Sequence, residues 1–337
     1  MTKNILKIIS LVFLVFVSAS TAQLIKKEHI ADKPLFRDPI YDGAADPVVI
    51  WNKAEQKWFM FYTNRRAKDK NLEGVSWVHG TEIGIAESED GASWSYRTTC
   101  SLDYDLPEIT QWAPEVIENE GVYHMYLTIV PGVFNDWSHP RSIIHLTSTN
   151  LIDWTYQSTL ALASERCIDA CVFRLPDGTW RMYYNNENDN KSIYYADSKD
   201  LYRWEDSGQK VISDRGEGPK VFRWKNKNWM VWDSWDGLNL YASNDFIHWK
   251  KQEQPILKEP GSGADDEVKG GHPDVVVQGD KAYIFYFTHP GRTLENKGVD
   301  TYETRRSSLQ VAELTYANGI ITCHRDKKVH INLIPDK

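Results

Sequence analysis

The sequence predicts an all-β fold, a single five-bladed β-propeller, and three observations support this prediction. A seven-residue turn motif recurs four times, and five similar segments open successive strands. The openings follow one another at intervals of about 45 to 70 residues, which is the spacing of propeller blades. The chain beyond its first residues shows no sustained helical periodicity.

The turn motif reads Ser-x-Asp/Asn-x-x-x-Trp, and a short apolar strand precedes each copy. The copies are SEDGASW (88–94), STNLIDW (148–154), SKDLYRW (198–204) and SNDFIHW (243–249). Short polar side chains accept hydrogen bonds from the amides of such turns, while the Trp packs back on the sheet. Four of the 14 Trp residues are therefore expected to be structural.

The strand openings precede these turns, and an aromatic-rich strand follows each opening. The openings are ADPVVIW (45–51), WAPEVIE (112–118), CIDACVFRL (167–175), GEGPKVFRW (216–224) and GHPDVVVQG (271–279). The fifth unit lacks the Trp turn and carries a long segment over 288–308 instead, before a final strand pair. Five openings predict five blades, with each opening strand lining the central channel.

The first residues are typical of an export signal. Lys3 and Lys7 precede an apolar run too short to span a bilayer, and small residues end near Ala22. We therefore expect a signal peptide over 1–22, a propeller catalytic domain over 23–337, and a periplasmic or secreted protein. No Cys follows the cleavage site, which argues against a lipid anchor. The net charge of −8, with no basic block, argues against nucleic acid as a partner, and we expect a monomer without a membrane span.

Polar residues recur at the start of the opening strands, where the strands face one mouth of the channel. They are Asp46, Glu115, Asp169, Glu217, and His272 with Asp274. A single carboxylate at a strand start is often only a turn acceptor, but several at one mouth repel one another and indicate a use. Glycoside hydrolysis needs one protonated and one ionised carboxyl group. Glu217 stands between Gly216 and Gly218, which we expect to allow a close approach of the backbone to a ligand.

These motifs resemble those of glycoside hydrolase family 43, whose members are five-bladed propellers acting on arabinans and xylans. The resemblance covers residues 36–325. It implies that Asp46 of ADPVVI is the general base, that Asp169 of CIDACVF orients the acid and modulates its pKa, and that Glu217 of GEGPKVF is the general acid. Family members invert the anomeric centre, which implies roughly 6.5–9.5 Å between base and acid.

The resemblance also places His272 near the channel centre, beside a calcium ion or an ordered water. It implies no required cofactor, and a structural Ca²⁺ held through a water on His272 is the one metal expected. Two departures concern the subfamily: Ala170 stands where Pro is usual, and Glu115 stands where Asp is commoner. Asp38, in a second Asp-Pro, competes with Asp46 for the role of base, and Asp46 is preferred because it directly precedes a blade strand.

Substrate contacts are expected from aromatic and polar residues near the mouth, because sugar C–H faces pack on rings. The predicted substrate-binding residues are Trp112, Glu115, Trp235 and His272. Further candidates in loops are Trp77, Trp137, His79, His289 and the pairs Arg65-Arg66 and Arg305-Arg306, which could meet an acidic sugar.

The sequence thus predicts an exo-acting, inverting glycoside hydrolase that releases a pentose, of the α-L-arabinofuranosidase or β-xylosidase type, from plant or algal oligosaccharides. Loops over 63–82, 130–141 and 288–306 would close the mouth to a pocket, which favours exo action. Two alternatives stay open. One is a five-bladed glycosidase for galactose, anhydro-galactose or uronic-acid-containing substrates, and the other is a propeller that binds glycans without cleaving them.

Overall fold

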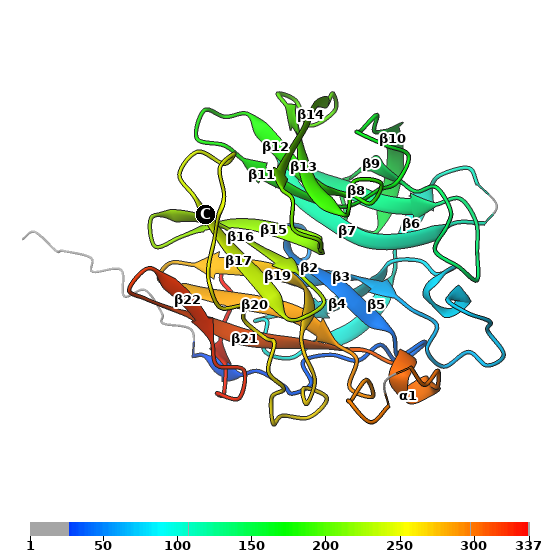
Figure 1. The fold of residues 1–337 in the computed structure, drawn as a ribbon, viewed down its shortest axis with the longest axis vertical. Helices are drawn as coiled ribbons and strands as arrows, with labels where there is room; N and C mark the ends of the chain where they lie inside the picture. The colour runs from blue at the N-terminus through cyan, green and yellow to red at the C-terminus, as the bar shows by residue number, and fades with distance from the viewer. Residues whose placement is uncertain (1–26, 107, 297, 336–337) are drawn as a thin grey trace, which may run out of the picture.

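The computed structural model describes residues 27–106, 108–296 and 298–335 and contains five antiparallel sheets around a central channel. This arrangement confirms the predicted five-bladed β-propeller (Figure 1). The predicted signal peptide lies outside the described residues. Among these residues, helix is confined to the 3₁₀ turn η1 (Ser76–Val78) and the short α1 (Tyr302–Arg305). Neither is long and apolar enough to cross a membrane.

Each blade starts with its innermost strand and runs outward. Blade 1 consists of β2 (Ala44–Asn52), β3 (Lys57–Asn64), β4 (Gly84–Ser88) and β5 (Ser95–Thr99). Blade 2 consists of β7 (Thr110–Asn119), β8 (Val122–Val130), β9 (Ser142–Ser148) and β10 (Asp153–Thr159), with β6 (Ser101–Asp103) added in parallel at its rim. Blade 3 consists of β11 (Cys167–Arg174), β12 (Trp180–Asn186), β13 (Ser192–Ser198) and β14 (Glu205–Ile212). Blade 4 consists of β15 (Glu217–Trp224), β16 (Lys227–Asp233), β17 (Leu238–Ser243) and β18 (Lys250–Lys251). Blade 5 consists of β19 (Gly271–Gln278), β20 (Lys281–Thr288), β21 (Ser308–Ala317) and β22 (Ile320–Cys323).

The four predicted turns connect the third and fourth strands of blades 1 to 4, and their hydrogen bonds follow the predicted pattern. In each turn the Ser hydroxyl accepts a bond of 2.8 to 2.9 Å from the amide three residues later. The residue at that position has a positive φ, between 63° and 81°, in all four turns. The Asp or Asn side chain accepts from amides further along, so the motif satisfies the backbone of a sharp turn.

The Trp of each turn ties its blade to the preceding one. Each indole packs edge-on against a ring from the second strand of that preceding blade, with centroids 5.4 to 6.5 Å apart. The pairs are Trp94 with Phe285, Trp154 with Phe61, Trp204 with Tyr126, and Trp249 with Tyr183. Blade 5 lacks this Trp, and its Tyr316 packs on Trp229 of blade 4 at 6.0 Å instead. The repeated Trp is therefore an inter-blade contact.

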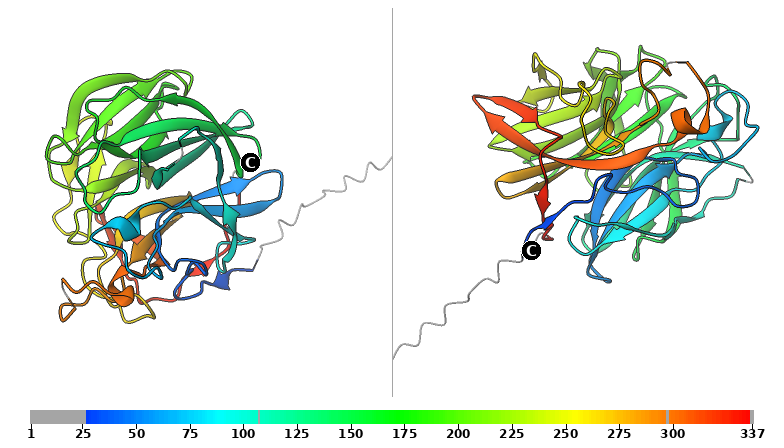
Figure 2. Two further views of the ribbon diagram at one scale, coloured as in Figure 1. Left: turned by 90° about the vertical axis from the view of Figure 1, so that its right-hand side faces the viewer. Right: turned by 90° about the horizontal axis from the view of Figure 1, so that it is seen from below.

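The two chain ends close the ring. The short β1 (His29–Ile30) pairs with β23 (His330–Ile331), so the two terminal segments run side by side (Figure 2). The N-terminal segment continues to blade 5, where Phe36 bridges Leu309, and the C-terminal segment reaches blade 1, where Trp58 Nε1 donates to Leu333 O at 3.2 Å. Blades 1 and 5 are thereby joined by the segments that flank the propeller.

Each innermost strand is interrupted by a β-bulge near its start. The register shifts at the same point in all five blades, and the residue there has a positive φ. These residues are Asp46 (φ 52°), Ala113 (φ 43°), Asp169 (φ 57°), Gly218 (φ 60°) and His272 (φ 25°). Bulges re-aim side chains and are frequent beside active sites. Here they bring one end of all five strands to a common mouth.

Candidate active site

A cavity of about 540 Å³ lies at this mouth. Six of the seven residues predicted as catalytic or substrate-binding line it: Asp46, Asp169, Glu217, Trp112, Trp235 and His272. Glu115 is the one predicted residue that does not line it. The three expected loops also contribute to the wall, through Trp77 and Val78, through Trp137 and Arg141, and through His289 and Arg292.

Asp46 lies on the wall of blade 1 and faces two nitrogen-bearing side chains. Both of its carboxylate oxygens lie 3.3 Å from Arg65 Nη2, and Oδ1 lies 3.5 Å from His272 Nδ1. Asp38, its competitor in the sequence, is buried outside the cavity. Its carboxylate accepts from the amides of Ile40 and Tyr41 and from the Tyr62 hydroxyl. The position of Asp38 is therefore that of a turn acceptor.

Asp169 is buried, like Asp46, on the wall that blade 3 contributes. Its Oδ2 accepts a hydrogen bond of 3.1 Å from the amide of Gly218, the residue after Glu217. Burial raises the pKa of Asp169 to about 7, with Glu217 and Asp46 adding to the rise and His272 opposing it. Asp169 thus couples blade 3 to the segment of blade 4 that carries Glu217.

Glu217 is the most accessible of these carboxyl groups, with 29% of its side chain exposed. Trp235 Nε1 donates to its Oε1 at 2.9 Å, and Lys191 Nζ lies 3.7 Å from Oε2. The two flanking glycines have a reason other than the expected approach to substrate. A Cβ on Gly218 would lie 2.7 Å from the His272 ring, and a Cβ on Gly216 would lie 2.6 Å from Asp233 O. They are needed for close packing inside the protein.

His272 and Asp233 form the inner edge of the cavity. The His272 amide donates to Asp233 Oδ2 at 3.0 Å. Burial lowers the pKa of His272, but the surrounding carboxylates Asp46, Asp169, Glu217 and Asp233 outweigh it, so the pKa is raised. Burial, reinforced by Glu217, raises the pKa of Asp233 to about 6. The sequence interpretation missed Asp233, although it ends the strand that pairs with Glu217.

Glu115 belongs to a buried ion cluster, which corrects the expectation that it contacts substrate. Lys220 Nζ lies 2.8 Å from Glu115 Oε2 and 2.9 Å from Asp274 Oδ1. The remaining carboxylate oxygens accept from neighbouring blades, Glu115 from Val172 N at 3.0 Å and Asp274 from Val49 N at 2.8 Å. Glu115 and Asp274 stand two residues after the bulge, so they point away from the mouth.

The residues of the channel are a poor match to calcium. Calcium prefers a shell of six to eight oxygen ligands, whereas Glu115 and Asp274 are already bound to the Lys220 ammonium. Over the described ranges no three His, Cys, Asp or Glu side chains gather as a metal site. A calcium ion held through a water on His272 stays a prediction.

The other loop candidates divide between the cavity and the interior. Trp77, Trp137, Arg65 and His289 line the cavity. His79 is buried behind Trp112 and its Nδ1 bonds Thr110 Oγ1 at 2.9 Å. Arg305 and Arg306 do not line the cavity, because they pair with Asp300, Asp265 and Glu303. The lining residues that sequence interpretation missed include Arg141, Arg166, Glu187, Lys191, Arg215, Asp233, Lys269, Phe287 and Arg292.

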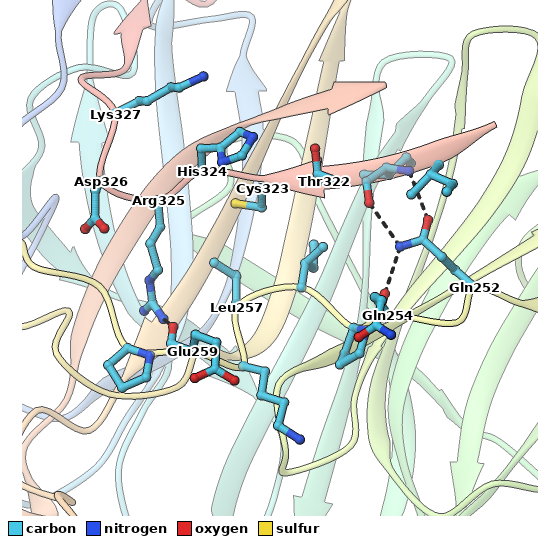
Figure 3. A pocket seen from close by; sticks show the side chains of 16 residues that line it. Gln252, Gln254, Leu257, Glu259, Thr322, Cys323, His324, Arg325, Asp326 and Lys327 are labelled. Carbon is cyan, nitrogen blue, oxygen red and sulfur yellow. Dashed lines mark hydrogen bonds between the residues drawn. The ribbon is translucent and has the colours of Figure 1, made fainter. Parts of the chain in front are cut away.

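A second cavity, of about 710 Å³, lies at the outer edges of blades 4 and 5 (Figure 3). Gln252 spans the gap there: its side chain donates to Ile321 O at 3.0 Å and accepts from Ile321 N at 2.9 Å. None of the carboxylates at the strand openings lines this cavity. It is larger than the cavity at the mouth, but the carboxyl groups expected for glycoside hydrolysis do not line it.

The fold and the mouth together define a class of protein: a five-bladed propeller that gathers carboxyl groups from several blades in one cavity, as glycoside hydrolases do. A family model described as glycosyl hydrolases family 43 matches residues 36–315. The chain belongs to this family and is a glycoside hydrolase. No curated protein matches the chain significantly.

Solved structures share the fold at low identity. A thermostable family-43 glycoside hydrolase is 19% identical, with a TM-score of 0.63, over 89% of this chain and 100% of that chain. A family 43 β-1,3-galactosidase with galactodeoxynojirimycin is 13% identical, with a TM-score of 0.62, over 85% and 96%. A β-xylosidase/α-arabinofuranosidase from a compost microbial metagenome, in complex with xylotriose and in a calcium-free form, is 14% identical, with a TM-score of 0.58, over 83% and 93%.

Proposed function

We propose that this protein is an exo-acting, inverting glycosidase that releases a pentose, of the α-L-arabinofuranosidase or β-xylosidase type, from plant or algal oligosaccharides. The observation that carries the proposal is the convergence of Asp46, Asp169 and Glu217, from three blades, on one cavity. The predicted signal peptide fits such substrates, because it would deliver the enzyme to the periplasm or the medium.

Asp46 is proposed as the general base. Its two nearest side-chain partners are Arg65 and His272, so the carboxylate has positive charge beside it and cannot swing freely. A fixed carboxylate can take a proton from a water that attacks the anomeric carbon. Although burial opposes it, the surrounding carboxylates raise the pKa of His272, which favours positive charge beside Asp46.

Glu217 is proposed as the general acid. It is the accessible carboxyl group, and the Trp235 indole fixes one of its oxygens. Asp169 accepts a hydrogen bond from the Gly218 amide, so it is proposed to orient the segment that carries the acid. The proton would pass from Glu217 to the leaving oxygen as the glycosidic bond breaks, while Asp46 accepts one from the water.

Exo action is supported by the loops around the mouth. Trp77, Trp137 and Arg292 come from the three long connections and stand on the cavity wall. A cavity enclosed in this way accommodates the end of a chain better than its middle. A pentose at its floor would then be released from a chain end.

The test compares the mature protein with Glu217→Ala on aryl pentosides and on plant and algal oligosaccharides. We expect the variant to lose about 10²–10⁴-fold on oligosaccharides and much less on aryl pentosides, because an aryl leaving group needs little protonation. Glu253→Ala, which removes an exposed carboxylate far from the cavity, is the matched control. Undiminished hydrolysis of oligosaccharides by Glu217→Ala would refute the assignment, and glycan binding without hydrolysis by the wild type would indicate a lectin.

A further inference from the structure

The cavity wall is more cationic than hydrolysis of a neutral sugar requires. Seven Arg or Lys side chains line it against five Asp or Glu side chains, in a chain whose net charge is −8. Most of these cations have an acidic partner, as Arg141, Arg166 and Lys191 do in Glu187. Three differ, because no carboxylate of the described ranges forms an ion pair within 4.0 Å with Arg215, Lys269 or Arg292, and of these three Arg292 is fixed by a hydrogen bond.

Arg292 is held at one end and open at the other. Its Nε donates to Thr304 O at 2.8 Å, and its guanidinium lies over the Trp77 ring, 5.7 Å from the centroid. No hydrogen bond is formed by its terminal nitrogens with the described residues. A planar guanidinium fixed in this way presents two parallel donors to the cavity.

Arg65 lies on the same wall and is fixed in a similar manner. Its guanidinium lies over the Phe287 ring at 4.9 Å, and its Nη1 is 3.0 Å from His289 Nε2. The other ring nitrogen of His289 lies 2.9 Å from Arg306 O, so His289 bears its proton there and accepts from Arg65. His289 therefore adds no charge, and Asp46 is the only carboxylate of the described part that pairs with Arg65.

The two guanidinium groups disturb one another. Arg292 is exposed on one side, and desolvation by the surrounding wall, followed by the charge of Arg65, lowers its pKa. The same two arginines, after burial, hold the pKa of His289 well below its usual range. Repulsion of this kind lowers the stability of the empty site and is relieved when a ligand brings negative charge.

We propose that Arg292 binds an oxyanion substituent, a carboxylate or a sulfate ester, on the sugar from which the pentose is released, while Arg65 stays paired with Asp46. This inference rests on the proposed function, because a pentose has no carboxylate of its own and the acidic group must then belong to the neighbouring residue. The oligosaccharide substrate is accordingly acidic.

The experiment uses three pentosyl disaccharides that differ only at C6 of the second sugar: xylosyl-galactose, xylosyl-galacturonate and xylosyl-galactose 6-sulfate. The ratio of kcat/KM for an acidic disaccharide to that for the neutral one is measured for the wild type, Arg292→Gln and Arg223→Gln. Arg223 is an exposed arginine of β15 that does not line the cavity, so its variant removes the same charge elsewhere.

We expect at least one acidic disaccharide to be preferred about 10- to 100-fold by the wild type and by Arg223→Gln, and this preference to be lost in Arg292→Gln. The acid that is preferred identifies the carboxylate or the sulfate. Because Arg292→Gln could fold poorly, the wild-type ratio is also measured between 50 and 500 mM NaCl, where the preference should fall. Equal rates on all three disaccharides would overturn the inference and leave the pentosidase standing. Arg292-dependent cleavage of uronosides without release of pentose would instead overturn the pentosidase and keep the anion site.

Discussion

The channel of the propeller has two layers, and they treat charge in opposite ways. At the mouth, Asp46, Asp169 and Glu217 share a cavity, and burial, followed by repulsion from the other two carboxyl groups, raises the pKa of Asp169. In the layer beneath, Glu115 and Asp274 are buried on either side of Lys220, with ion pairs of 2.8 and 2.9 Å. The mouth leaves carboxyl groups close to one another, whereas in the lower layer one ammonium group is shared by both carboxylates.

The difference between the layers comes from two positions of one repeated bulge. The residue with positive φ faces the mouth in blades 1 and 3, and the residue two places later faces the lower layer. In blades 1 and 3 that later residue is the apolar Val48 and the thiol Cys171. In blade 5 the two positions hold His272, which lines the mouth, and Asp274, which pairs with Lys220, so a shift of two residues separates a side chain at the mouth from a structural ion.

The largest effect on folding is expected from Lys220→Met. The substitution leaves two buried carboxylates without their shared counter-ion, which we expect to lower the free energy of unfolding by about 3–5 kcal/mol. Urea denaturation followed by Trp fluorescence would measure this loss. The channel would lose stability although no residue at the mouth has been changed.

The control for this variant is Lys225→Met, which removes another lysine of blade 4 and breaks its exposed pair with Asp280 of blade 5. We expect a change of at most about 0.5 kcal/mol there, because exposed ion pairs contribute little. A similar loss in the two variants would contradict the division of the channel into two layers.

The repeat predicted the fold because its signals are local. A Ser, an Asp and a Trp at fixed spacing specify a turn and an inter-blade contact, whatever the rest of the chain does. The carboxylates of blades 1, 3 and 4 could be placed at the mouth for the same reason. Glu115 was predicted at the mouth because, as the acidic residue of its strand opening, it was taken as the equivalent of Asp46.

The proline positions would have corrected this. When Pro47, Pro114 and Pro273 are aligned, Glu115 falls at the position of Asp274. The cationic wall could not be predicted by aligning the repeats, because its residues come from loops that do not repeat, among them Arg141, Lys269 and Arg292. Their convergence depends on the closed ring, which only the three-dimensional structure shows.

The mouth is expected to respond to Asp46→Asn in the opposite way to Lys220→Met. Loss of the base should lower kcat by about 10²–10⁴-fold on the preferred substrate. The free energy of unfolding should change by no more than about 1 kcal/mol, because the lost pairs with Arg65 and His272 are offset by weaker repulsion of Asp169. Steady-state kinetics and thermal unfolding on the same preparation measure both quantities.

Asp38→Asn is the matched control for Asp46, since it alters the other Asp-Pro of the same region. Its carboxylate supports the amides of Ile40 and Tyr41 and the Tyr62 hydroxyl, so we expect a loss of about 1–3 kcal/mol in stability and normal turnover per folded molecule. If Asp38→Asn abolished turnover and Asp46→Asn did not, the base would have been assigned to the wrong residue.

The smallest effect, and the most specific to the mouth, is expected in the pH dependence of Asp169→Asn. The pKa of Asp169 is raised, mainly by burial, to about 7 in the folded protein, above the ordinary value of 3.8 for an aspartate side chain. The folded state thus binds the proton more tightly than the unfolded state, so this group's contribution to stability is present below about pH 4 and is lost as the pH rises through 7. Asparagine cannot ionise, so the variant should lack this part of the decline in the free energy of unfolding, which is on the order of 2 kcal/mol after allowance for neighbouring charges.

Unfolding free energies of the wild type and the variant between pH 4 and 8 would test this. The two curves should converge at low pH and separate in favour of the variant near neutrality. Curves that stay parallel would show that the Asp169 carboxyl group is already ionised at low pH, and that the mouth does not accumulate repulsion.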